Sequence, residues 1–165
     1  MLLTKLYRPK TKPYLVYRQN LSDILDKAKN KKLVLVSAPA GYGKTTIVAQ
    51  WIDKNNHSCA WYSLDNSDNE PTVFLNYLIS GIQTIKNDFG QNALKLLNSP
   101  NRVNIESVVS LLINNMLEFE DDIFIVLDDI HVIRLIRIRF DRFIQPIISE
   151  ILWGLKFMVN SRRCT

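Results

Sequence analysis

A loop with two glycines, a lysine and two threonines stands between an apolar run and an amphipathic run of this chain. The apolar run LVLVS (33–37) is short and rich in β-branched residues, and it stops before Pro39. Such a run predicts a fully buried parallel strand. The residues TTIVAQWID (45–53) follow the loop with helical periodicity. A strand that enters a glycine loop and leaves it as a helix restricts the chain to an α/β fold.

The loop has the pattern of a phosphate cradle. Residues 38–45 (APAGYGKT) match the phosphate-binding loop, or P-loop, at every position except the first, where Ala38 replaces a glycine. Backbone N–H groups of such a loop surround an anion, and the following helix adds its positive end. Lys44 is expected to reach the β- and γ-phosphates, and the Thr45 hydroxyl to bind Mg²⁺. The alternative, an accidental glycine turn, is disfavoured because the strand and the helix both stand where the motif requires them.

The predicted nucleotide contacts in the loop are Ala40, Gly41, Tyr42, Gly43, Lys44, Thr45 and Thr46. Thr46 is expected to lie closer to the α-phosphate.

Further strands alternate with helices along the rest of the chain, which predicts βαβ units and a parallel sheet flanked by helices. Asp68 and Asn69 are predicted to cap the third helix, with Pro71 in its first turn. The expected strands are 33–37, 59–64, 123–129 and 155–159; the expected helices are 21–29, 45–53, one carrying Phe74, Leu75, Leu78, Ile79 and Ile82, one carrying Ile105, Val108, Val109, Leu112 and Met116, and part of 140–152. Residues 87–104 form a polar, Asn-rich stretch, and residues 1–17 are expected to be extended around Pro9 and Pro13.

Length and composition indicate one globular domain over residues 1–165. Hydrophobic residues make up 47% and charged residues 22% of the chain, with a net charge of +5. The chain has neither an apolar run long enough for a membrane span nor a secretory signal, so a cytoplasmic location and no membrane partner are expected. Cys59 and Cys164 are interpreted as reduced thiols. Nucleic-acid binding by these residues is disfavoured, because the positive charges are spread out and no zinc-finger or basic-zipper pattern occurs.

Two carboxylates end the apolar run IFIVL. In an open parallel sheet, ligands lie beyond the carboxyl ends of the strands, so Asp128 is predicted to hold Mg²⁺ opposite Thr45. Asp129 could orient or deprotonate an attacking water. Arg162 follows the last strand in the same way and could contact the γ-phosphate or be an exposed basic residue. His131 is interpreted as a hydrogen-bonded structural residue.

Several blocks together resemble the N-terminal nucleotide-binding domain of large MalT-like, LuxR-type transcriptional activators, which are signal-transduction ATPases of the STAND class. The most specific block is AWYSLDNSDNEPTVFLNYL (60–78), at the expected spacing from the P-loop. The other blocks are KLYRPK (5–10), VYRQNLSDIL (16–25), SAPAGYGKTTIVAQW (37–51), FIVLDDIHVI (124–133) and KFMVNSR (156–162).

The resemblance implies roles for individual residues. Val16 and Arg18 match the segment against the adenine and ribose, Asp128 the Mg²⁺-binding acid, Asp129 the catalytic acid and Arg162 the sensor arginine. It also implies binding of ATP or ADP with Mg²⁺, self-association driven by ATP and an inducer, and at most slow Mg-dependent ATP hydrolysis. DNA would be bound only through a helix-turn-helix region that this chain lacks.

The chain is expected to be an N-terminal fragment whose sheet is incomplete at its C-terminal end. The resemblance implies that the strand 155–159 inserts between the acidic strand and the P-loop strand. It also implies a fifth strand on the other side of the P-loop strand, and because this chain ends before such a strand, 33–37 is expected at an uncovered edge. Residues 134–153 match the family poorly. Two other functions stay open at this point: a small P-loop phosphotransferase such as a kinase, with Arg134, Arg137, Arg139 and Arg142 as a basic lid, and an inert truncated product.

Overall fold

A computed structural model describes residues 1–12, 14–100, 104–119, 122–133 and 155–161. A sheet of four parallel strands forms its centre, in the order β1-β4-β3-β2. The strands are β1 (Leu33–Ser37), β2 (Cys59–Ser63), β3 (Ile123–Asp128) and β4 (Leu155–Ser161). All four expected strands are therefore present, and β4 lies between β3 and β1, as predicted.

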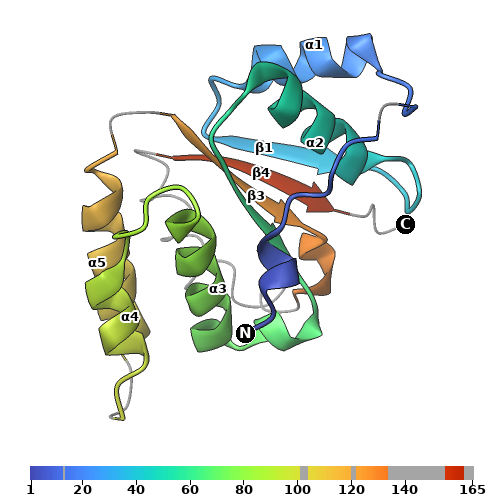
Figure 1. Ribbon diagram of the computed structural model, residues 1–165. Coiled ribbons are helices and arrows are strands. Elements are labelled where there is room, and N and C mark those ends of the chain that lie inside the picture. Colours follow the sequence, from blue (N-terminus) through green and yellow to red (C-terminus); the bar gives the residue numbers. More distant parts are fainter. Residues whose placement is uncertain (13, 101–103, 120–121, 134–154, 162–165) are drawn as a thin grey trace.

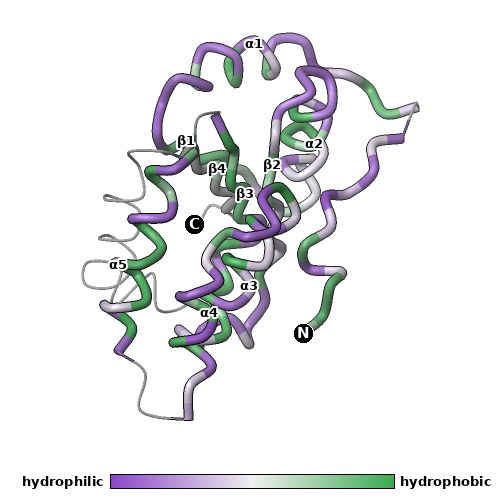
Figure 2. Tube along the Cα trace, turned by 60° about the vertical axis from the view of Figure 1, so that its left-hand side comes forward, coloured by the Kyte–Doolittle hydropathy of each residue, from purple (hydrophilic) through white to green (hydrophobic). Residues whose placement is uncertain are grey.

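Helices cover both faces of the sheet. On one face lie α1 (Gln19–Ala28) and α2 (Lys44–Asn55); on the other lie α3 (Pro71–Gln83), α4 (Gln91–Leu97) and α5 (Ile105–Met116) (Figure 1). The hydropathy-coloured trace shows hydrophobic strands at the centre and hydrophilic stretches on the outer helices (Figure 2). The mixed α/β architecture with a parallel sheet between helices is thus confirmed. Among the described residues, no helix is long and apolar enough to cross a membrane.

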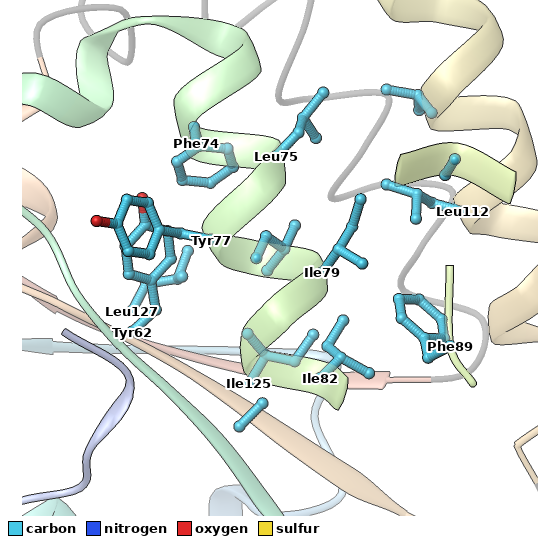
Figure 3. Close-up of a cluster of buried hydrophobic side chains, with 14 of the residues drawn as sticks. Tyr62, Phe74, Leu75, Tyr77, Ile79, Ile82, Phe89, Leu112, Ile125 and Leu127 are labelled. Atoms are coloured by element: carbon cyan, nitrogen blue, oxygen red, sulfur yellow. The ribbon is translucent and has the colours of Figure 1, made fainter. Parts of the chain in front are cut away.

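Two cores form because strand side chains alternate between the faces of the sheet. The larger core joins α3, α4 and α5 to residues such as Tyr62, Ile125 and Leu127 (Figure 3). The smaller core joins α1 and α2 to Trp61, Val126 and Met158, which are aligned across three neighbouring strands. The strand register therefore places the end of β3 directly beneath α2.

The burial of β1 differs from the prediction. β3 is buried along its whole length, whereas Leu33 and Leu35 of β1 are 43% and 63% exposed. β1 pairs only with β4 among the described residues and lies at the edge of the sheet. Of the β1 residues, Val34 and Val36 are the partly buried ones that pack against the smaller core. The expectation of a fully buried strand was wrong because it took apolar composition as a measure of position within the sheet. The other expectation, that 33–37 would lie at an edge of the sheet, is confirmed for the described residues.

The start of α3 corrects the predicted cap. Glu70, not Asp68 or Asn69, is the N-cap, and its side chain accepts a hydrogen bond from the Val73 amide. Pro71 opens the helix, as expected. Asp65 instead caps a short 3-10 turn, Asn66–Asn69, in which Asp68 is fully buried. Asp68 is therefore used inside the protein, where it pairs with Lys5.

Two further segments differ from their sequence patterns. The Asn-rich stretch contains α4, whose Ala93 and Leu97 are buried although most of the segment is polar. Within residues 1–17, expected to be extended, Leu3–Leu6 form a 3-10 turn. This turn buries Leu6 against the larger core and brings Lys5 to Asp68. The predicted partial helix in 140–152 lies outside the described residues.

Candidate functional site

The glycine loop joins the carboxyl end of β1 to the first turn of α2. Gly41 and Gly43 have φ angles of 80° and 78°, in the left-handed region that favours glycine. A Cβ at either position would meet no atom within 4 Å, so backbone conformation rather than space requires glycine here. Gly43 is the N-cap of α2 and provides no side-chain cap. The first amides of the helix are therefore available to an anion.

Thr45, in the first turn of α2, contacts Asp128, the last residue of β3, at the carboxyl end of the parallel strands. The Thr45 hydroxyl lies 3.0 Å from each carboxylate oxygen of Asp128, although the residues are 83 positions apart in the chain. Asp128 is only 4% exposed, and its Oδ1 also accepts the Asp129 amide at 3.1 Å. The fold thus brings together the two residues that the sequence predicted as a pair.

The Lys44 ammonium folds back over the loop. Its Nζ donates to the Pro39 carbonyl oxygen at 3.1 Å, and the side chain is half-buried. Thr46, the next residue of α2, is also half-buried, whereas Ala40 and Tyr42 are exposed. Within the part of the chain that the structure describes, the Pro39 carbonyl therefore holds Lys44 at the mouth of the loop, where an anion bound by the loop would lie within its reach.

Asp129 lies just beyond the end of β3 in a left-handed conformation, with a φ of 58°. It begins the short turn Ile130–Val132, and its side chain is 47% exposed. The same turn places His131 Nδ1 at 3.6 Å from Asp129 Oδ1. That nitrogen is buried and has no hydrogen-bond partner in the described part of the chain. The hydrogen-bonded role expected for His131 is thus not seen at this atom, and its proximity to Asp129 was missed because sequence spacing does not show the turn.

Val16 and Arg18 flank a firmly held tyrosine. The Tyr17 hydroxyl donates to buried Ser22, and the Lys54 ammonium lies 4.3 Å from the centre of the Tyr17 ring. Val16 is 82% exposed, and Arg18 is the exposed N-cap of α1. In the described structure neither residue makes a hydrogen bond or ion pair with the loop, so their expected contact with the base stays a prediction. Arg162 lies outside the described residues.

The donor set suits a magnesium nucleotide. Mg²⁺ prefers oxygen ligands and commonly takes one or two from protein and others from phosphates and water. Thr45 and Asp128 offer a hydroxyl and a carboxylate side by side, next to a helix start that has no side-chain cap. Among the described residues, no group of three or more His, Cys, Asp or Glu side chains could hold a metal ion by itself. A metal here would therefore depend on the phosphates for further ligands.

Parts of known proteins are similar in sequence to this chain. The family model described as "Nephrocystin 3, N-terminal" matches residues 11–162. The HTH-type transcriptional regulator MalT of Vibrio cholerae is 40% identical over 131 residues, and MalT of Yersinia pestis is 37% identical over 131 residues. Each match covers 79% of this chain, which spans only 14% of the length of those relatives. The chain belongs to the nephrocystin 3 N-terminal family, and its curated homologues over 79% of its length are MalT transcriptional regulators.

Proposed function

We propose that this chain is a P-loop NTPase domain that binds ATP or ADP with Mg²⁺, and that it acts as the nucleotide-dependent switch of a MalT-like regulator. The observation that carries the proposal is the contact of the Thr45 hydroxyl with both carboxylate oxygens of Asp128, beside the glycine loop. A helix start, a hydroxyl and a buried carboxylate meet at one edge of a parallel sheet, which is where α/β folds bind ligands.

Each residue would contribute a separate interaction. The amides of Gly41 to Lys44 would bind phosphate oxygens, and the Lys44 ammonium would exchange the Pro39 carbonyl for the outer phosphates. Thr45 and Asp128 would hold Mg²⁺, which supplies charge neutralisation to the phosphates when it is bound. Asp129 is partly exposed next to this edge and would orient a water molecule for slow hydrolysis.

The regulatory role rests on the relatives. The matched proteins are named HTH-type transcriptional regulators, and this chain matches a small part of each. We assign DNA contact to regions of those relatives outside the matched part, and nucleotide-dependent self-association to this domain. A regulator of this kind would work in the cytoplasm.

Calorimetric titration with Mg-ATP and Mg-ADP tests the proposal. Lys44→Ala should weaken binding about 10- to 100-fold, because a hydrogen bond to a charged group contributes about 1.5–3 kcal/mol. Lys95→Ala is the matched control, since Lys95 is an exposed helical lysine of α4 on the opposite side of the sheet from α2. The proposal fails if the parent chain binds neither nucleotide, or if Lys44→Ala binds like Lys95→Ala.

A further inference from the structure

Ser63 ends β2 at the same edge of the sheet as Asp128. The two residues are partners in the register of the parallel β2–β3 pair, and the Leu64 amide donates to the Asp128 carbonyl oxygen at 3.0 Å. Neighbouring strands lie about 4.8 Å apart, so the two backbones are close. The sequence analysis gave Ser63 no role.

The side chains of Ser63 and Asp128 lie on the same face of the sheet. Trp61 and Val126 are also register partners, and both belong to the core beneath α2. Ser63 and Asp128 each follow two residues later, and strand residues two apart face the same way. Thr45 of α2 contacts Asp128 from above this face. Ser63 is therefore a neighbour of the Thr45–Asp128 pair, on the side of strand β2.

A hydrogen bond from Trp61 fixes the position of the Ser63 hydroxyl and leaves its O–H group able to donate a hydrogen bond. Trp61 Nε1 donates to Ser63 Oγ at 3.1 Å, and Trp61 is 1% exposed. A hydroxyl has one donor and two acceptor sites, so this bond uses one acceptor and leaves the O–H group as a donor. Because the indole is fixed by its packing, the bond restricts the position of Oγ. An ordered donor thus stands next to the proposed metal ligands.

We propose that Ser63 is a positioning residue of the magnesium site, whose hydroxyl donates a hydrogen bond to an oxygen of the shell around the metal. This inference rests on the proposed function. The carboxylate and phosphate oxygens that surround a bound Mg²⁺ are hydrogen-bond acceptors, so a hydroxyl donor beside them can fix their positions. Residues that hydrogen-bond to metal ligands typically change metal affinity 10- to 100-fold. The competing explanation is that Ser63 only satisfies the Trp61 indole.

Two titrations on the full chain separate these explanations. The first follows Mg²⁺ binding at a fixed ATP concentration, and the second follows ATP binding in the presence of a chelator. Ser63→Ala should weaken the Mg²⁺ response about tenfold and leave metal-free ATP binding unchanged. Ser63→Thr keeps a hydroxyl and should restore the response. Asp128→Asn gives the size of the effect when a ligand is lost, and Ser110→Ala, at an exposed serine of α5, should behave like the parent.

A second variant guards against misfolding of Ser63→Ala, which leaves a buried indole N–H without its acceptor. Trp61→Phe keeps the Ser63 hydroxyl but removes the bond that orients it, so the Mg²⁺ response should weaken severalfold while metal-free binding persists. If Ser63→Ala and Trp61→Phe both retain the parent's Mg²⁺ response, or if Ser63→Ala weakens metal-free binding equally, Ser63 has no positioning role. A parent chain that binds no nucleotide would overturn the proposed function as well as this inference.

Discussion

Lys5 Nζ lies 2.8 Å and 2.9 Å from the two carboxylate oxygens of Asp68, and both side chains are buried. The ammonium also lies 2.9 Å from Asp65 Oδ2 and 4.7 Å from the centre of the Tyr77 ring. Burial alone lowers the pKa of Lys5, but the bonds from Asp68 and Asp65 outweigh it and the net pKa is raised. This pair ties the start of the chain to the loop between β2 and α3.

Lys5→Ala should destabilise the protein by about 3–5 kcal/mol, because it leaves the fully buried Asp68 carboxylate without its cation. That is a large part of the roughly 5–15 kcal/mol that stabilises a typical domain. Urea unfolding measures the loss. The double variant Lys5→Met with Asp68→Leu should recover most of it, since neither charge is then left buried. If Lys5→Ala unfolds at the parent's urea midpoint, the pair does not stabilise the native state.

Acid should weaken the same network through Asp65. Hydrogen bonds from Ser67 and then from Lys5 lower the pKa of Asp65 to about 2 in the folded protein. A carboxyl whose folded pKa is depressed adds stability above its unfolded pKa, and this contribution is lost as pH falls through the folded value. Asp65→Asn should therefore be less stable than the parent at neutral pH, and the difference should shrink between about pH 5 and pH 2.

Thermal melting across that pH range checks the prediction. Asp88→Asn, which removes an exposed carboxylate before α4, controls for the change in net charge. A difference between parent and Asp65→Asn that stays constant down to pH 2 would contradict the linkage.

The sequence predicted the parts of this fold that depend on local pattern. Strand β3 could be recognised because every residue from Ile123 to Leu127 is apolar, and the glycine loop between β1 and α2 because glycine, lysine and threonine follow one another between a strand pattern and a helix pattern. Adjacency of Thr45 and Asp128 followed from a general rule, namely that parallel strands bring their carboxyl ends to one edge. The parallel arrangement of the strands, and with it the proximity of Thr45 to Asp128, could thus be predicted from sequence patterns and a general rule of α/β folds.

Long-range pairing could not be predicted in the same way. Asp68 has the sequence context of a helix cap, and only the folded chain shows Lys5 arriving from 63 positions away. The expected strand order did place β1 at an edge, but the composition of β1 does not record that the Leu35 side chain is exposed. The place of Ser63 beside Asp128 and the proximity of His131 to Asp129 were also missed, since one depends on strand register and the other on the left-handed conformation of Asp129.

Asp129→Asn should retain nucleotide binding and slow hydrolysis, because the amide keeps the side chain's shape and removes the charge that would orient water. General-base catalysis contributes about 10²- to 10⁴-fold, so the single-turnover rate with Mg-ATP should fall within that range. Asp122→Asn is a matched control, as an exposed aspartate at the other end of β3. Equal rates in the parent and Asp129→Asn would contradict the catalytic role.

The exposed edge strand gives the last prediction. Leu35 is 63% exposed on β1, a strand that the described residues cover on one side only. An apolar, uncharged edge can pair with another chain, so the protein should self-associate when concentrated. Leu35→Lys should reduce light scattering, because charge on an edge strand opposes strand pairing. Leu117→Lys is the matched control: Leu117 is 65% exposed but follows helix α5, so scattering should stay at the parent's level.

Mg-ATP at 100 times its Kd should add about 2.7 kcal/mol to the free energy of unfolding. If Mg-ATP raises the melting temperature but leaves scattering unchanged, aggregation proceeds from the folded state through this edge. If instead Leu35→Lys and Leu117→Lys lower scattering equally, general apolar exposure rather than the β1 edge drives it.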